Sequence, residues 1–385
     1  MTGSPGKMPQ DIRITATRTS SRSFGPGIGD GMDRARLIRP TARDWDAWVG
    51  RADHDFYHLA AYHAFAEAEG EGEAWLALYE DGDRFLAWPY LLRDAGNGYS
   101  DATSVYGYSG PVGQGLEDPD FRNVAWNAVR AAWKDQKLAA LFTRLHPLLD
   151  NAALASGFAG DRVPPGGELM TIGRSVSLDL SHDETTRRAL YPQPLRQDVK
   201  KAERLGLEVT LDRDWDAFPD FVEQYRATMA KNAASDAYLF SDAYFERLKT
   251  ALTGIAHLAV ARVDGEVAGA MIFTVNRPFA AAHLTGTNPA FNAYSPLKVL
   301  IDRTADLAAR LGATRLHLGA GRGGHEDSLF SFKSRFSPDR HDFALGRWIL
   351  DAEAYDTLCA ARPGPQSDTF FPAYRAPIPT EHAAE

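Results

Sequence analysis

The stretch WLALYEDGDRFLAW, residues 75–88, joins two apolar runs through an Asp-Gly pair. The stretch LAVARVDGEVAGAM, residues 258–271, repeats this pattern, and its Asp264 follows Asp81 after 183 positions. An Asp-Gly pair between apolar runs is the strongest short-range signal of a β-hairpin closed by a two-residue turn. The sequence therefore predicts two similar hairpins far apart in the chain.

The segments that follow the two hairpins also correspond. After the first hairpin come a strand-like, a helical and a second strand-like segment, at 105–110, 121–137 and 138–144. After the second hairpin the same order returns, at 281–286, 296–311 and 313–318. Strands that alternate with helices in this way are typical of an α/β layout with a mixed sheet. We predict an α/β (α+β) fold with two similar mixed sheets, in which the two hairpins are equivalent parts.

Composition divides the chain further. Residues 1–32 are rich in Gly, Ser, Thr, Pro and Arg without apolar periodicity, which predicts a disordered tail. Glycine and proline accumulate between positions 157 and 167, which makes this the best domain boundary. We expect a first domain at 33–168, completed by the C-terminal segment 350–385, and a second domain at 169–349.

Charge and cysteine content limit the function. The net charge of −9 argues against a general polyanion binder but allows a local basic patch. The single cysteine, Cys359, excludes a disulfide framework and a thiolate metal cluster. No apolar run reaches the roughly 20 residues of a membrane span, so we expect a cytoplasmic protein. No zinc motif accompanies His54, His58 and His63, so we expect no metal site.

Three short motifs narrow the class of protein. They are YGYSGP at 106–111, LRQDVKKAERLGL at 195–207 and FKSRF at 332–336. Together they resemble the Fem proteins, the tandem-GNAT transferases that add amino acids from aminoacyl-tRNA to peptidoglycan precursors. The resemblance covers residues 34 to 350, except that the long helical arm of the cell-wall members is missing. It implies two tandem GNAT-like acyltransferase domains, the first on the acceptor side and the second on the donor side.

The first candidate site is the turn that precedes the helical segment 296–311. A serine N-cap followed by a proline predicts a strong helix start, and a helix N-terminus suits a phosphate group. In GNAT folds the donor's pyrophosphate lies on this turn; the usual glycine-rich loop is missing here, which weakens coenzyme A as the donor. A plain capped helix that binds nothing is the other interpretation. We assign the following residues to substrate binding: His283, Thr285, Tyr294, Ser295 and Lys298.

The second candidate site is the glycine-rich turn GAGRGGHEDS at 319–328 with the helical turn after it. Glycines let a ligand approach the backbone closely, so we assign Gly321 to substrate binding, together with Arg335. Lys333 projects beside two phenylalanines, and the family resemblance implies that it stabilises the oxyanion of the tetrahedral intermediate. The alternative is a solvated surface charge.

Removal of a proton from the attacking amine needs a base. Asp327, Glu326 and His325 are candidates by position, and the sequence does not choose among them. We name Asp327 as a catalytic residue beside Lys333.

A third candidate is the basic helix near residue 200. Arg196, Lys200 and Arg204 recur at intervals of four, so one helical face carries cations that repel one another unless an anion lies nearby. Phosphates of tRNA or of a nucleotide-linked acceptor are natural partners for these residues and for Lys201. A solvated face, partly neutralised by acidic neighbours, is the alternative.

The fourth candidate is the pair Tyr106 and Tyr108, which strand alternation places on one face. By resemblance they line the acceptor cleft, whereas the alternative is packing beneath the sheet.

These observations predict an N-acyltransferase. In this interpretation the aminoacyl group of aminoacyl-tRNA passes to the amine of a small-molecule, peptide or cell-wall-precursor acceptor, without a covalent enzyme intermediate and without a cofactor. A first alternative is a GNAT N-acyltransferase that uses acyl-coenzyme A. A second is a non-catalytic protein that binds tRNA or a peptide.

Overall fold

The computed structural model describes residues 34–231, 239–363 and 370–377, and all of them belong to one compact unit. In the first part of the chain the strands are β1 (Arg36–Ile38), β2 (Glu73–Asp81), β3 (Arg84–Gly96), β4 (Tyr99–Thr103), β5 (Val112–Gln114) and β6 (Leu138–Arg144). Later strands are β7 (Leu169–Asp179), β8 (Glu208–Asp212), β9 (Ala256–Val263), β10 (Glu266–Asn276), β11 (Phe279–Thr287), β12 (Arg315–Gly319) and β13 (Arg340–Ile349).

Helices lie between the strands. The longer ones are α2 (Ala60–Ala68), α3 (Pro119–Asp135), α6 (Gln193–Arg204), α7 (Phe218–Lys231), α8 (Asp242–Ala251), α9 (Pro296–Arg310) and α11 (Ala352–Ala361). Shorter ones are α1 (Asp44–Val49), α4 (Asn151–Ala155), α5 (Glu184–Ala189), α10 (Ser328–Lys333), η1 (Phe56–His58), η3 (Pro289–Tyr294), η4 (Arg322–Gly324) and η5 (Ala373–Arg375). Within the described residues, no helix is both long enough and apolar enough to cross a membrane.

The strands form one mixed sheet in the order β1-β2-β3-β4-β6-β13-β7-β12-β11-β10-β9-β8, with β5 beside β3. Read from either end, the order is the same: antiparallel strands lead to one parallel pair, β4–β6 on one side and β11–β12 on the other. This correspondence confirms the duplicated α/β layout. We call strands β1 to β6 with helices α1 to α4 the first half. Strands β8 to β12 with helices α5 to α10 are the second half.

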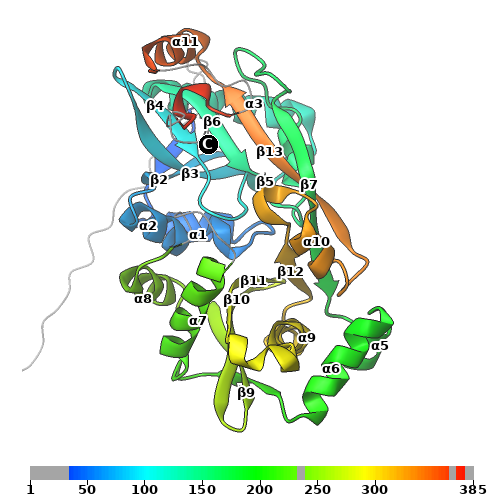
Figure 1. Ribbon diagram of the computed structural model, residues 1–385. Coiled ribbons are helices and arrows are strands. Elements are labelled where there is room, and N and C mark those ends of the chain that lie inside the picture. Colours follow the sequence, from blue (N-terminus) through cyan, green and yellow to red (C-terminus); the bar gives the residue numbers. More distant parts are fainter. Residues whose placement is uncertain (1–33, 232–238, 364–369, 378–385) are drawn as a thin grey trace, which may run out of the picture. The chain divides into compact units, whose positions relative to one another are not determined.

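The centre of the sheet is an exchange of strands. β7 follows β6 in the chain but pairs with β12 of the second half, and β13 follows β12 but pairs with β6 of the first half. β7 and β13 are antiparallel to each other and join the two halves, as the green and orange strands in Figure 1 show. The expectation of two separate sheets was therefore wrong, because each half takes its last strand from the other.

The two Asp-Gly hairpins also differ in detail. In the first, Asp81 still pairs with Arg84, so the turn residues are Gly82 and Asp83. In the second, Asp264 is itself a turn residue, with φ 50°, and Gly265 follows with φ 86°. Both are two-residue hairpins, as predicted, but the two aspartates occupy different positions in them.

Residues 105–110 are a loop rather than the predicted strand, because β4 ends at Thr103. Gly107 and Gly110 have φ values of 106° and 117°, which a strand does not allow. This loop runs from the first half towards the second.

The halves share a hydrophobic core. Helix α2 packs against α8, and buried side chains such as Phe65, Tyr244 and Leu258 belong to one cluster. A second cluster lies under α9 and α6, and a third lies under α3. C-terminal helix α11 packs on β6, so the end of the described chain covers the first half. Since 34–385 is one compact unit, the domain bounds that we drew from the sequence stay a prediction.

Candidate active site between the two halves

The parallel strands β11 and β12 separate early. They pair only from Phe279 with Arg315 to Ala281 with His317. Beyond that point β11 continues to Thr287 without a partner on β12. The side chains of His283 and Thr285 lie on this separated part of β11.

Lys333 is the last residue of α10, a short helix whose N-cap is Asp327. The side chain is half-buried, and its Nζ atom donates a hydrogen bond to the backbone oxygen of Ala320 at 2.7 Å. Burial lowers the pKa of Lys333 from 10.5 to about 8, against the opposing field of Asp327. Lys333 is therefore not a freely solvated surface charge.

The backbone at Ala320 is also contacted from the first half. The amide of Ala320 donates a hydrogen bond to the hydroxyl oxygen of Tyr108 at 3.2 Å. The preceding residue, Gly319, has φ 76°, and a Cβ atom there would lie 3.2 Å from the Tyr108 hydroxyl and 3.5 Å from Lys333 Nζ. The predicted residues Tyr108 and Lys333 thus meet at the backbone of one residue, Ala320, although they are far apart in the sequence.

Tyr106 and Tyr108 do not lie in the environment that strand alternation predicted. Tyr106 is one of the exposed large side chains, at 37% exposure, and its ring centroid lies 6.3 Å from that of His283. Tyr108 is half-buried, and its ring packs on His317 at 4.9 Å. Tyr106 therefore faces β11 and Tyr108 faces β12, so the loop contacts both separated strands.

His283 lies beside Tyr106, and we call Tyr106, Tyr108 and His283 together the rim of the candidate site. Its ring contacts Phe56, Tyr57 and Tyr62, and burial lowers its pKa to about 4, so the imidazole is neutral near pH 7. Its Nε2 atom is buried without a hydrogen-bond partner in the described structure. Sequence reasoning missed the aromatic residues around it, because Phe56 and Tyr57 stand in no motif.

A buried pair of hydrogen-bonded side chains lies behind these residues. Asp55 and His146 are both fully buried, and His146 Nε2 lies 3.1 Å from Asp55 Oδ2. The other ring nitrogen of His146 accepts a hydrogen bond from the amide of Leu148 at 3.2 Å. With both nitrogens engaged, His146 supports the site and is not free to exchange protons with a substrate.

Two of the three candidate bases, Asp327 and Glu326, form hydrogen bonds and ion pairs within the protein. Asp327 Oδ1 accepts the amide of Phe330 and Oδ2 pairs with Arg322, and these contacts hold the pKa of Asp327 below its usual range. Glu326 forms a two-bonded pair with Arg174, which lowers its pKa as well. His325, the third candidate by position, is exposed.

The glycine-rich turn packs on itself. A Cβ atom at Gly321 would lie 2.2 Å from Asp327 Oδ1, so this glycine makes room for the cap of α10. Arg335 is exposed and lies over the ring of Phe332, with its guanidinium carbon 5.2 Å from the ring centroid. The contacts described for Gly321 and Arg335 are therefore structural ones, within the helical turn and its cap.

The turn before α9 differs from the predicted cap. Ser295 is the N-cap residue, but it is left-handed (φ 52°) and its side chain makes no capping hydrogen bond. Lys298 donates to Asp198 of α6 at 2.5 Å, so it is ion-paired. Tyr294 ends the 3₁₀ helix η3 and is half-buried. A helix start is confirmed here, whereas its N-terminal lysine is bound to α6.

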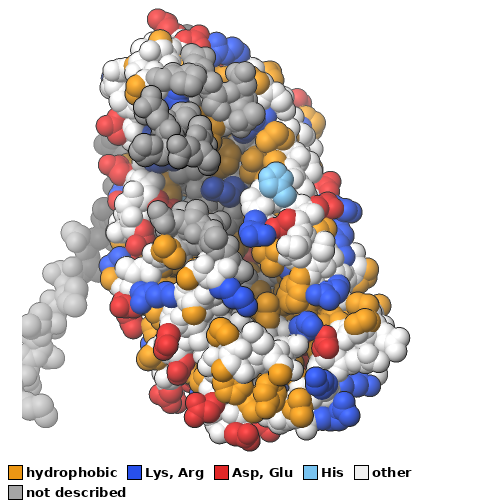
Figure 2. Space-filling view, viewed as in Figure 1, with side chains coloured by type: hydrophobic (Ala, Val, Ile, Leu, Met, Phe, Trp, Pro, Cys, Tyr) orange, Lys and Arg blue, Asp and Glu red, His pale blue; other side chains and the backbone are white. Residues whose placement is uncertain are grey.

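Helix α6 presents three exposed cations, Lys200, Lys201 and Arg204. Arg196 is half-buried and donates to the backbone oxygen of Tyr191 at 2.6 Å, so it anchors the start of the helix. Figure 2 shows Lys and Arg side chains gathered over α6, whereas acidic side chains gather over the β9–β10 hairpin.

A buried ionic network fixes α6 against α9. Asp302 of α9 is fully buried and accepts hydrogen bonds from Arg188 and from the hydroxyl of Tyr191. Arg188 also donates to Glu203 of α6 at 2.6 Å. The cations of α6 therefore stand on a rigid support.

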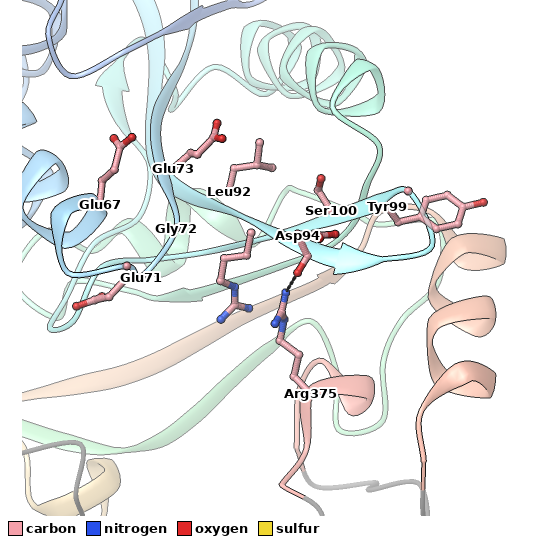
Figure 3. A pocket seen from close by; sticks show the side chains of 12 residues that line it. Glu67, Glu71, Gly72, Glu73, Leu92, Asp94, Tyr99, Ser100 and Arg375 are labelled. Atoms are coloured by element: carbon pink, nitrogen blue, oxygen red, sulfur yellow. Dashed lines mark hydrogen bonds between the residues drawn. The ribbon is translucent and has the colours of Figure 1, made fainter.

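A separate hollow of about 700 Å³ lies in the first half, away from Lys333 (Figure 3). Its wall is formed by the α2–β2 turn, β3, β4 and η5: Glu67, Gly70, Glu71, Gly72, Glu73, Leu92, Arg93, Asp94, Gly98, Tyr99, Ser100 and Arg375. Many of these charges are paired, since Arg375 donates to the backbone oxygen of Asp94 and also pairs with Asp101. Nothing in the sequence motifs pointed to this hollow.

Among the described residues, no group of three His, Cys, Asp or Glu side chains could hold a metal ion. His58 and His63 are each buried among aromatic rings, and burial lowers the pKa of both.

Comparison with known proteins agrees with this architecture. Residues 192–333 match the family described as acetyltransferase (GNAT) domain. The crystal structure of FemX superposes with a TM-score of 0.64 at 13% identity, over 84% of this chain and 99% of that one. A conserved protein of unknown function from Bacteroides thetaiotaomicron VPI-5482 superposes with a TM-score of 0.51 at 12% identity, over 82% of this chain and 99% of that one. No curated protein matches the chain in sequence.

Fold and comparisons together define the class: the chain has a tandem GNAT fold of the acyltransferase type. More narrowly, it has the Fem-like arrangement of that fold, as the three sequence motifs predicted.

Proposed function

We propose that this protein forms an amide bond by moving an aminoacyl group from aminoacyl-tRNA to the amine of an acceptor. The acyltransferase fold supports acyl transfer in general. The donor and the acceptor are the parts that we add.

The observation that carries the proposal is the placement of Lys333. Its Nζ atom has three N–H donors, and its hydrogen bond among the described residues, to Ala320, engages one of them, which leaves donors for a developing oxyanion. The charged amine is half-buried between the halves, where a hydrogen bond to an oxyanion is stronger than in water.

The proposed chemistry is a direct displacement. The acceptor nitrogen, in its neutral form, attacks the ester carbonyl carbon, and the carbonyl oxygen becomes an oxyanion that Lys333 stabilises. The carbon–oxygen ester bond then breaks, the ribose hydroxyl of the tRNA leaves, and the proton lost by the nitrogen balances the leaving oxygen. No residue of the protein becomes acylated.

The donor side favours tRNA in two respects. The turn that would carry a coenzyme A pyrophosphate, residues 288–295, contains no glycine and begins a helix whose Lys298 is already paired with Asp198. Lys200, Lys201 and Arg204 are exposed on a rigid helix close to α9, and such cations suit the phosphates of an acceptor stem. In the other direction, the match to an acetyltransferase domain favours acyl-coenzyme A as the rival donor.

The acceptor side is assigned to the rim formed by Tyr106, Tyr108 and His283. The rim lies between the two halves and includes an exposed aromatic ring that could stack on an acceptor. A neutral histidine there does not repel an incoming ammonium group, so an amine is the nucleophile that this rim suits.

The test is a parallel titration with coenzyme A and with a pool of charged tRNAs, followed by analysis of which tRNA loses its amino acid to added amines. We expect binding of charged tRNA with a steep salt dependence. Tight coenzyme A binding without any response to charged tRNA would overturn the proposed donor and leave the fold assignment intact.

Charge reversal sharpens the test. The double variant Lys200→Glu/Lys201→Glu should weaken tRNA binding and flatten its salt slope, since it removes two phosphate contacts. The control Lys134→Glu/Lys137→Glu makes the same change of net charge at exposed positions of the first half. Equal weakening by both variants would mean that only overall charge matters, and would remove α6 from the tRNA site.

A further inference from the structure

The backbone of Ala320 is held from two sides by side chains of different halves: its N–H belongs to the 319–320 peptide and its C=O to the 320–321 peptide. Lys333 of the second half donates to the carbonyl of Ala320, and Tyr108 of the first half accepts from its amide. The second contact joins residues 212 positions apart. We propose that Tyr108 is a positioning residue: its hydroxyl fixes the backbone of Ala320 and, through the Ala320 carbonyl, the ammonium group of Lys333.

The two hydrogen bonds are geometrically coupled. The Tyr108 hydroxyl and the Lys333 ammonium approach the same face of Gly319, which a Cβ atom would fill. The N–H and the C=O of Ala320 belong to consecutive peptide groups that share its Cα atom, so a shift of this residue moves its carbonyl away from Lys333 and its amide away from Tyr108 together. Loss of one hydrogen bond therefore loosens the other.

Tyr108 is a fixed acceptor because its ring is enclosed. Rings from η1, from the segment after β6, and from β12 and β13 surround it, with centroids between 4.9 and 6.0 Å away: Tyr57, His146, His317 and Phe343. A ring packed on several sides does not follow a moving backbone. The hydroxyl therefore sets the position of the peptide, rather than the reverse.

The loop that carries Tyr108 is anchored on both sides of it. The hydroxyl of Tyr62 donates to the backbone oxygen of Tyr106 at 3.0 Å, and Asn151 Nδ2 donates to the backbone oxygen of Ser109 at 2.7 Å. Under the proposed function, on which the catalytic consequence rests, an acceptor bound at this loop contacts the same element that positions Lys333. The first half then contributes to catalysis in the second without touching the reacting atoms.

Three titratable side chains face the Lys333 amine. Asp327, before α10, favours the charged form, whereas His317 of β12 is fully buried, with its pKa well below the usual value, and is therefore neutral. Tyr108 is the third. Without its hydroxyl the Ala320 amide loses this acceptor, the backbone of Ala320 can shift, and the ammonium loses the Ala320 carbonyl. Burial and Asp327 stay as they are, so the pKa of Lys333 falls further.

The test measures the Lys333 amine directly, without substrate. Acetic anhydride labels neutral amines, and peptide mass spectrometry of labelling across neutral and alkaline pH gives the titration midpoint of this lysine. In Tyr108→Phe we expect the midpoint to fall by about half a pH unit or more, because a hydrogen bond to the charged form is lost. In a transfer assay the alkaline limb of kcat should move down with it, with KM for the donor unchanged.

The matched control is Phe343→Leu, which loosens the packing of the same ring but keeps the hydroxyl. Its labelling midpoint should equal that of the wild type; an equal shift in both variants would assign the effect to packing and overturn the proposal. An unchanged midpoint in folded Tyr108→Phe would overturn it as well. If Tyr108→Phe does not fold, Gly319→Ala perturbs the backbone next to Ala320 from the other half, and a wild-type midpoint in that variant would count against the coupling.

Labelling and catalysis separate the two proposals. A shifted midpoint in a protein that never deacylates charged tRNA would refute the proposed function and leave the positioning role standing. Transfer from charged tRNA with an unshifted midpoint would support the proposed function and refute the positioning role of Tyr108.

Discussion

Replacing Lys333 by methionine should stabilise the protein while it removes activity. Methionine has a similar length and no charge, so the packing beside Phe332 is kept. The pKa of Lys333 falls from 10.5 to about 8 on folding, and each unit corresponds to about 1.4 kcal/mol, so burial of the charge costs about 3 kcal/mol at neutral pH. The unpaired Ala320 carbonyl offsets about 1 kcal/mol of the gain, which leaves a net stabilisation of about 2 kcal/mol.

The sign of the pH dependence follows from the same shift. The folded pKa is below the unfolded one, so wild-type protein carries the full cost below pH 8 and loses it as the pH rises towards 10.5. The advantage of Lys333→Met should therefore be largest near pH 7 and vanish in strongly alkaline buffer.

The assay is chemical denaturation of wild type and variant at neutral and at alkaline pH, with the exposed Lys134→Met as the control, together with amide-forming turnover. We expect at least a tenfold loss of turnover in Lys333→Met, as for removal of an oxyanion-stabilising donor. Wild-type transfer should also decline as the pH rises through about 8, where the ammonium is lost. A variant that is less stable at pH 7, or equally stabilised at both pH values, would refute the reasoning from burial.

Three further outcomes are expected. Asp327→Ala should destabilise the protein by about 1 kcal/mol, because α10 loses its N-cap, and should lower turnover. Asp327→Asn still caps the helix and should restore turnover. If the asparagine variant stays inactive, the carboxylate acts as a base. Asp302→Ala should destabilise the protein in denaturation, because Arg188 and the hydroxyl of Tyr191 lose their buried partner and, of its described partners, Arg188 keeps only Glu203 and Glu184; unchanged stability would show that the network relaxes around the gap. Asp55→Ala should lower stability by about 1–3 kcal/mol in a thermal melt, because the buried Nε2 atom of His146 loses its hydrogen-bond partner.

The sequence alone determined the local elements of this protein. Both Asp-Gly hairpins, the helix that begins at Pro296, the basic helix near residue 200 and the helical turn ending at Lys333 lie where their patterns predicted. Each depends on side chains within a few positions of one another, through turn chemistry, proline placement and apolar periodicity. The duplication of these elements was therefore readable from sequence, and with it the tandem fold.

Only the tertiary structure decided how the halves join. The exchange of β7 and β13 depends on strand pairing over long sequence separations, which a local apolar pattern does not encode. The loop at 105–110 was mistaken for a strand because its aromatic residues fit both, and the positive φ of Gly107 is not visible in a pattern.

The chemistry of the candidate site was decided in the same way. Sequence named Lys333, Asp327 and Tyr108, but it could not assign a capping role to Asp327 or a contact with Ala320 to Tyr108. The lowered pKa of Lys333 arises from desolvation by burial, so it exists only in the folded protein. Residue type and spacing fix which groups are present, whereas burial and distant neighbours fix what those groups can do.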